Sequence, residues 1–381
     1  MGSRNRSRTM RCSRCGVTLV VPPSARNICC SICRHTTYVG RDPVRHAVGF
    51  VKSMVSTLAN SGNSFNSSQY SYGSQAGMQQ FGYQNPAVYI PTNYPRVFGK
   101  KRALLIGITY ASSRYELKGT INDVNCVAYL LSQKFGFPKE CILILTDEDP
   151  DPYKTPTKEN MRAAMRWLVS GCAAGDSLVF HFSGHGVQKL DTTHDEVDGY
   201  DEALCPLDFE TNGPILDDEI NATIVRPLPF NVKLHALVDA CHSGTILDLP
   251  YLCRISRSGS WQWEDHGAPS GEYKGTRGGL AILISGCDDN QTSSDTSAFA
   301  GSTSTGAMTY SFIQAIECEP GTTYGRLLTS MRAAIRETGS SCQFSGPIAS
   351  LIRKAIPFGS TQEPQLSSSE MFEIYRKPFL L

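Results

Sequence analysis

One histidine and one cysteine stand in two glycine-containing runs that could carry nucleophilic catalysis. His185 lies in the run Ser-Gly-His-Gly that begins at residue 183, and Cys241 lies in the run Asp-Ala-Cys-His-Ser-Gly that begins at residue 239. A thiolate nucleophile needs a nearby base, and glycines let backbone amides approach the carbonyl group under attack. These residue types predict acyl-transfer chemistry, with Cys241 as the nucleophile and His185 as its base. The neighbouring His181 and His242 are expected to be structural.

The elements that must position these two residues are strands of a mostly parallel sheet. After residue 96, short apolar runs alternate with helical stretches, a pattern typical of an α/β sheet flanked by helices. The predicted strands are 103–108, 141–145, 178–182, 234–238 and 280–284, with an edge strand at 373–376. The predicted helices lie near 121–135, 158–172, 308–317 and 324–337. The third and fourth strands run directly into the two reactive runs, at the edge where catalytic groups gather in parallel sheets.

These two runs resemble those of metacaspases, the caspase-like cysteine peptidases of plants, fungi and protists. The whole chain is similar to the plant type I members, which combine a zinc finger of the lesion-simulating-disease type, a flexible prodomain and the peptidase. The resemblance implies a caspase-like (caspase-hemoglobinase) fold for the peptidase. It also implies that Cys241 attacks the peptide carbonyl, that His185 serves the proton transfers, and that the backbone amides of Gly186 and Cys241 stabilise the oxyanion.

The same resemblance implies cleavage after Arg or Lys. By motif match, the pocket for the cationic side chain consists of Asp123, Ser183 and Asp239. Carboxylates in such a pocket pair with a cation and reject an anionic side chain. Asp123 has an alternative interpretation, since an aspartate near the start of a helix is also a common cap. The other peptidase-region cysteines, including Cys205, are expected to be core thiols, with Cys205 as a less favoured nucleophile.

An acidic segment follows the histidine. Residues 191–219 contain eleven Asp or Glu and no Lys or Arg. Hard carboxylate oxygens at several points of one loop suit Ca²⁺, whose coordination is flexible. The resemblance narrows the calcium ligands to Asp201, Asp217, Asp218 and Asp248. The alternative is a solvated acidic loop without a metal.

Four cysteines near the N-terminus have the spacing of a zinc site. They form two CxxC pairs, Cys12 with Cys15 and Cys30 with Cys33. Such pairs present four thiolates tetrahedrally to Zn²⁺, and metal binding would supply the folding free energy that a segment of this size lacks. Four unrelated core thiols are the alternative, but this segment has no core to hold them.

Three regions follow from composition. We expect a zinc finger at 1–40, a disordered prodomain linker at 41–95, and a peptidase at 96–381. The peptidase is divided into a large-subunit-like part at 96–253, an exposed loop at 254–279 and a small-subunit-like part at 280–381. Residues 53–95 carry no charge and are rich in Ser, Asn, Gln, Gly and Tyr, a composition that does not offset its ordering entropy.

The overall charge of +1 is a cancellation: residues 1–52 sum to +9 and residues 96–381 to −8. We expect the basic head to bind regulatory proteins rather than nucleic acid, because its finger lacks a base-reading helix. No apolar run reaches the about 20 residues that a membrane span needs, and no signal-peptide core is present. The expected location is the cytoplasm, with the nucleus as a further compartment.

The resulting hypothesis is a calcium-dependent cysteine endopeptidase that cleaves proteins or peptides after Arg or Lys. It would be made as a self-processing zymogen that regulates programmed cell death or stress responses. Candidate self-cleavage residues are Arg96, Lys100, Lys101, Arg102, Arg254, Arg257, Lys274 and Arg277. The alternative is a zinc-finger scaffold that acts by protein interaction without peptidase activity. The intact set of His185, Cys241 and Asp239 argues against it.

Overall fold

The computed structural model describes residues 8–11, 18–21, 27–29, 36–38, 90–193, 196, 199–256, 259–287, 306–319, 321–336 and 363–381. Near the N-terminus it has two antiparallel pairs, β1 (Arg8–Arg11) with β2 (Thr18–Val21) and β3 (Asn27–Cys29) with β4 (Thr36–Tyr38). The proposed zinc ligands Cys12, Cys15, Cys30 and Cys33 lie outside the described residues. The zinc site therefore stays a prediction.

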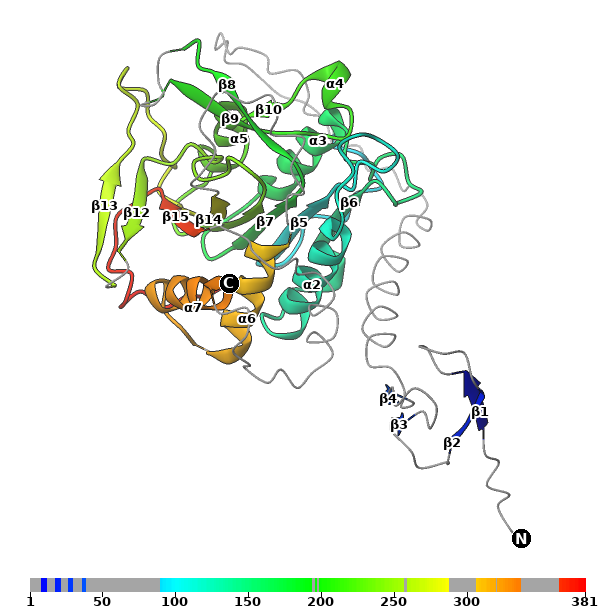
Figure 1. Ribbon diagram of the computed structural model, residues 1–381. Coiled ribbons are helices and arrows are strands. Elements are labelled where there is room, and N and C mark those ends of the chain that lie inside the picture. Colours follow the sequence, from blue (N-terminus) through cyan, green and yellow to red (C-terminus); the bar gives the residue numbers. More distant parts are fainter. Residues whose placement is uncertain are drawn as a thin grey trace.

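An eight-stranded sheet organises the body, in the order β13-β12-β15-β14-β11-β7-β5-β6 (Figure 1). Five strands run parallel: β5 (Lys101–Gly107), β6 (Ile142–Thr146), β7 (Ser177–Ser183), β11 (Lys233–Asp239) and β14 (Leu280–Cys287). Three antiparallel strands extend one edge: β12 (Tyr251–Ile255), β13 (Trp261–Asp265) and β15 (Glu363–Ser368). The predicted mostly parallel sheet is confirmed, and its five predicted central strands match to within a few residues.

The central strands are apolar almost throughout because both faces of the sheet are covered. On one face, alternate strand residues such as Leu105, Val179 and Ile282 pack on α2 (Thr120–Gln133), α6 (Ala307–Cys318) and α7 (Tyr324–Arg336). On the other face, residues such as Leu104 and Phe180 pack on α3 (Lys158–Val169) and on η2 (Asn221–Val225), a π-helix. Figure 1 shows the two layers, with α2, α6 and α7 below the sheet and α3 above it.

A second, three-stranded sheet lies beyond β7. It consists of β8 (Gly186–Leu190), β9 (Tyr200–Leu204) and β10 (Ile215–Leu216), paired antiparallel in the order β10-β9-β8. The short helices η1 (Lys139–Cys141), α4 (Phe209–Asn212) and α5 (Asp217–Ile220) complete the described elements. None of the helices in the described ranges is long and apolar enough to cross a membrane.

Three sequence predictions require correction. The body already includes residues 90–95: Tyr94 is buried, its hydroxyl donates to the carbonyl of Tyr153 at 3.0 Å, and Trp167 donates to the carbonyl of Pro95 at 2.7 Å. The predicted strand 373–376 is wrong, because this stretch contains turns and the C-terminal strand is β15. The expected loop 254–279 contains the hairpin strands β12 and β13, which close the edge of the sheet opposite β6.

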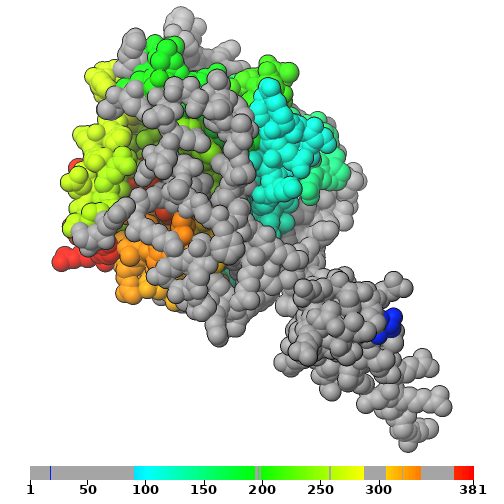
Figure 2. Space-filling model, in the orientation of Figure 1, coloured from blue at the N-terminus to red at the C-terminus, as the bar shows by residue number. Residues whose placement is uncertain are grey.

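Figure 2 shows that residues of this hairpin region, in yellow-green, form one flank of the visible face, with the cyan start of the body on the opposite flank. The hairpin was missed because its Gly, Ser and charged residues resemble loop composition. Its apolar residues Cys253 and Trp263, which are paired across the hairpin, have a core to pack on only once the sheet is assembled.

Candidate active site

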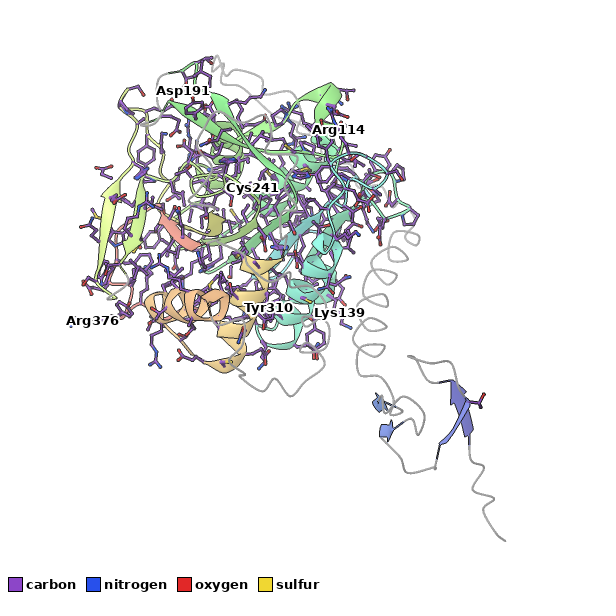
Figure 3. All side chains as sticks on the ribbon, in the orientation of Figure 1. Arg114, Lys139, Asp191, Cys241, Tyr310 and Arg376 are labelled. Atoms are coloured by element: carbon purple, nitrogen blue, oxygen red, sulfur yellow. The ribbon has the colours of Figure 1, made fainter. Side chains whose placement is uncertain are left out.

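The register between β7 and β11 brings the two reactive runs together. Ser183 at the end of β7 pairs with Asp239 at the end of β11. His185 and Cys241 each follow two residues later, so they leave the same edge of the sheet side by side. Figure 3 shows Cys241 near the centre of the body, and the residue lies two positions after the carboxyl end of β11. The predicted meeting of the two runs is confirmed.

The two turns are in direct backbone contact. The amide of Gly184 donates to the carbonyl of Asp239 at 3.3 Å. A Cβ atom on Gly186 would lie 2.1 Å from the backbone oxygen of Cys241, a distance that real side chains do not reach. Position 186 therefore requires glycine, because only glycine lets the histidine turn approach the nucleophile turn this closely.

The ring of His185 is oriented from the opposite side. Its Nε2 lies 2.8 Å from the backbone carbonyl oxygen of Tyr115. A carbonyl only accepts hydrogen bonds, so Nε2 carries the proton and Nδ1 is the unprotonated ring nitrogen. Burial lowers the pKa of His185, and the bond to Tyr115 only partly offsets this. The imidazole is therefore neutral at neutral pH and can accept a proton at Nδ1.

Tyr110 supports the histidine as well. Its hydroxyl accepts the backbone amide of His185 at 3.0 Å and donates to the backbone carbonyl of Cys205 at 2.6 Å. Its ring lies 4.8 Å from the imidazole, and its backbone is left-handed, with φ of 50°. Tyr110 and Tyr115 were missed in the sequence; their one available signal was their position directly after the predicted first strand.

Three other body cysteines are poorly suited to attack. Burial raises the pKa of Cys205, Cys126 and Cys253 to about 12 each. A thiol is nucleophilic as its thiolate, so these groups are inert at neutral pH. His181 is also structural: burial lowers its pKa to about 4, and its Nδ1 bonds the carbonyl of Leu237 at 2.9 Å.

The three proposed specificity residues form one buried group next to Cys241. Asp123 in α2 accepts a hydrogen bond from the hydroxyl of Ser183 at 2.7 Å. Asp123 also lies close enough to Asp239 for the charge of Asp239 to affect the ionisation of Asp123. Burial, together with the charge of Asp239, raises the pKa of Asp123 well above its ordinary value. Asp123 does not cap α2, whose N-cap is Gly119.

The start of α6 holds the second carboxylate of this pair. The amide of Thr309 donates to Asp239 at 2.8 Å. Burial raises the pKa of Asp239, although the amides at this helix start lower it in part. A Cβ on Gly306, whose φ is 103°, would lie 3.1 Å from Asp123. The specificity pair, Asp123 and Asp239, is thus two buried carboxylates without an ion pair among the residues that the structure describes.

A second acidic group lies around α5 and the loop after Cys241. Asp217 accepts the amides of Glu202 and Asp218, both at 2.9 Å. Burial, followed by the charge of Glu202, raises the pKa of Asp217 to about 9. Thr245, four residues after the nucleophile, donates to the carboxylate of Glu202. Asp201 is buried beside Glu202 on β9.

Asp248 joins this group from the nucleophile side. It is 4% exposed, and burial raises its pKa to about 7 although Lys274 opposes that change. Lys274 lies 2.5 Å from Asp248 Oδ1 and 2.7 Å from Glu196 Oε1, whereas Asp248 Oδ2 is buried without a hydrogen bond. We call Glu196, Glu202, Asp217, Asp218 and Asp248 the acidic cluster.

The acidic cluster fits a hard cation by its chemistry. It offers several carboxylates, and the buried Asp248 Oδ2 accepts no hydrogen bond from the described residues. Asp217, Asp218 and Asp248 lie within electrostatic range of one another. In the described part of the chain, however, no three His, Cys, Asp or Glu side chains are already arranged around one metal position. Glu196, Glu202 and Lys274 were not predicted as members of this group.

Comparison with known proteins agrees with this site. Residues 101–250 match the family described as metacaspase, peptidase C14 domain. Metacaspase-1 of Arabidopsis thaliana is 50% identical over 98% of this chain and 96% of its own length, and Metacaspase-3 of the same plant is 47% identical over 98% and 99%. Metacaspase-1A of Neurospora crassa is 38% identical over 78% of this chain and 69% of its own. The chain therefore belongs to the metacaspases, which are cysteine-type peptidases with a caspase-like fold.

Proposed function

We propose that the chain is a calcium-dependent endopeptidase that cleaves after Arg or Lys, with Cys241 as its nucleophile. The observation that carries the proposal is the pairing of β7 with β11, which sets His185 beside Cys241 and two buried carboxylates beside both. Neutral His185 takes the thiol proton at Nδ1 while Cys241 Sγ forms a bond to the scissile carbonyl carbon. The carbonyl π electrons move to oxygen, where the amides of Gly186 and Cys241 stabilise the oxyanion.

The tetrahedral species then collapses. The carbonyl re-forms, the C–N bond breaks, and the amine leaves with the proton held by His185, so a thioester to Cys241 remains. Water gives a proton to the same Nδ1 and attacks the thioester carbon. The C–S bond of this second tetrahedral species then breaks, the carboxylic acid leaves, and the proton on Nδ1 returns to Cys241 Sγ. The Tyr115 carbonyl keeps Nδ1 available in both half-reactions, because it holds the other ring proton.

The specificity pair supports a cationic side chain at the cleavage position. Two carboxylates, held without a cation by Ser183 and by the start of α6, present negative charge in a buried place. A guanidinium or ammonium that enters between them would be desolvated and would gain charge-assisted hydrogen bonds. An acidic side chain would meet like charge instead, and this excludes caspase-type cleavage after Asp.

Calcium dependence is supported by the acidic cluster. Asp217, Asp218 and Asp248 would hold the ion, with Asp201 alongside on β9. The ion would supply positive charge to carboxylates that otherwise repel one another. Thr245, four residues after Cys241, donates a hydrogen bond to Glu202. Binding of an ion to the acidic cluster would therefore alter the position of the loop that follows Cys241.

Self-processing belongs to the same proposal. Among the candidate residues, Arg96, Lys100, Arg254 and Arg277 are exposed. Arg102 and Lys274 are buried, and Lys101 is held by the carbonyls of Phe135 and Leu381, so these three are not accessible in this conformation. Arg257 lies outside the described residues. Family membership extends the proposal to a cytoplasmic regulator of cell death or stress responses, with Zn²⁺ on the N-terminal cysteines.

The decisive experiment measures cleavage of an Arg-ended fluorogenic peptide during a calcium titration. Wild type should gain activity with calcium, and Cys241→Ala should lose at least about 10⁴-fold, as expected when a nucleophile is removed. Cys205→Ala is the matched control and should stay near wild type. Activity retained by Cys241→Ala would reject the assigned nucleophile, and a flat calcium response would reject the metal dependence.

A further inference from the structure

Lys274 is a buried cation inside the acidic cluster. It belongs to the segment between β13 and β14, which the sequence suggested was exposed. Its side chain is 1% exposed, and its ammonium contacts both Glu196 and Asp248. Gly275 and Thr276 are buried with it, whereas Tyr273 and Arg277 on either side are exposed, so residues 274–276 turn inward from the surface.

The backbone around Lys274 is fastened to the nucleophile loop. Asn221 is fully buried, and its side-chain amide donates to the carbonyls of Leu247, Asp248 and Lys274, each at 3.0 Å. One side chain thus ties together η2, the loop after Cys241 and the segment that carries Lys274. A displacement of Lys274 would therefore act on a loop that begins a few residues from the nucleophile.

Charge explains why the lysine is there. Burying an ammonium by itself costs free energy, but its bonds with Asp248 and Glu196 outweigh this and raise the pKa of Lys274. Conversely, Asp248 and Glu196 would repel each other without it. The lysine supplies the positive charge that the cluster needs when no metal is bound.

A divalent cation needs the same oxygens. Asp248 has one carboxylate oxygen on Lys274, and its other oxygen is buried with no hydrogen bond from the residues that the structure describes. A calcium ion bound there would lie within a few ångströms of the ammonium, where two positive charges repel strongly in a buried setting. Metal and ammonium are therefore alternatives at this position.

We propose that Lys274 is an internal cation that competes with calcium for Asp248 and Glu196, and that calcium binding expels it to the surface. This inference rests on the proposed calcium dependence. In the metal-free chain, Lys274 offsets part of the negative charge of the cluster through Glu196 and Asp248, and its side chain is itself withheld from any peptidase. Once displaced, it becomes an accessible lysine in the segment between β13 and β14, whereas Arg277 is accessible in both states.

Calcium affinity tests the competition directly. We would titrate calcium into the full-length Cys241→Ala chain, which cannot process itself, and follow the heat of binding. Adding Lys274→Met should tighten calcium binding about tenfold or more, because no charge-assisted bonds must be broken to admit the ion. Lys274→Arg keeps a cation in place and should bind no tighter than the parent. Arg277→Met, an exposed cation three residues away, should not change the affinity.

Cleavage by trypsin measures whether Lys274 becomes exposed, and this measurement needs no substitution of a buried residue. In the Cys241→Ala chain, the ratio of cleavage after Lys274 to cleavage after Arg277, measured by mass spectrometry, should rise about tenfold or more with calcium. Both cuts lie in one segment, so effects of calcium on trypsin cancel in the ratio. This arm keeps the test decisive if Lys274→Met does not fold.

The outcomes separate the two ideas. If the parent chain binds calcium but Lys274→Met binds no tighter and the trypsin ratio is unchanged, the competition is wrong and calcium dependence stands. If neither chain binds calcium, the proposed calcium dependence fails and the competition fails with it. Tighter binding together with a raised ratio supports both.

Discussion

Two buried acidic groups flank the nucleophile, and they differ in whether they contain a cation. The specificity pair, Asp123 and Asp239, is held by a hydroxyl and by backbone amides, with no ion pair among the described residues. The acidic cluster contains the ammonium of Lys274. Both lie near the reactive edge of the sheet, and burial raises carboxyl pKa values in each.

The presence or absence of an internal cation determines how a cation from solution would bind to the specificity pair and to the acidic cluster. Neutral donors stabilise a carboxylate pair only in part. Under the proposed specificity, the Arg or Lys side chain of a substrate would supply the positive charge that the specificity pair lacks. In the acidic cluster, the ammonium of Lys274 already supplies positive charge. A cation from solution must displace an existing partner there, so its binding changes the structure around it.

The largest effect should come from removing one charge of the specificity pair. Asp239→Asn should lower kcat/KM for an Arg-ended peptide about 10²-fold or more, because a substrate cation would lose a buried ionic partner. The calcium concentration for half-maximal activity should not change. Steady-state kinetics across a calcium series measures both, and a shifted calcium response would mean that the two acidic groups are not separate.

Substitutions in the acidic cluster should weaken the response to calcium and leave substrate specificity unchanged. Asp217→Asn with Asp218→Asn should raise the calcium concentration for half-maximal activity about tenfold or more, since carboxylate ligands are replaced by neutral amides. The preference for an Arg-ended over a citrulline-ended peptide should persist at saturating calcium. Loss of that preference would contradict the assignment of specificity to Asp123 and Asp239.

The pH dependence of recognition follows from the raised pKa values of Asp123 and Asp239. A carboxyl group is neutral below its pKa, so as pH falls the pair loses its charge at a pH above the ordinary range for Asp. Binding of an Arg-ended peptide to Cys241→Ala should therefore weaken as pH falls, by up to about tenfold per unit. A citrulline-ended peptide is the uncharged control, and an unchanged ratio between pH 8 and pH 5.5 would oppose the idea.

The smallest effect should come from Ser183→Ala. Its hydroxyl donates one hydrogen bond to Asp123, and the loss of one such bond costs about 1–3 kcal/mol. We expect kcat/KM for the Arg-ended peptide to fall about tenfold, with the thermal midpoint within a few degrees of wild type. Ser177→Ala at the other end of β7 is the control. A large loss of stability would assign Ser183 to folding instead.

Much of this site could be read from local residue patterns. The central strands are runs of β-branched and aliphatic residues such as Leu104 and Ile282, and their burial on both faces is what makes them apolar. His185 and Cys241 were recognisable because each follows such a strand in a glycine-containing turn. The hairpin of β12 and β13 was not recognisable, since its composition resembles a loop and its pairing depends on the far C-terminal strand β15.

Residue types and the periodicity of short segments predicted the nucleophile and its base, and they correctly predicted the parallel sheet whose strands lead to both. The contact of His185 with a carbonyl 70 positions away, and that of Lys274 with a carboxylate 78 positions away, became visible only in the folded chain. Long-range contacts of this kind depend on which chain segments the sheet brings together. The type of a single residue does not indicate which distant segment it will contact. The charge of the acidic segment 191–219 was visible in the sequence, but its ion pair between Glu196 and Lys274 was not.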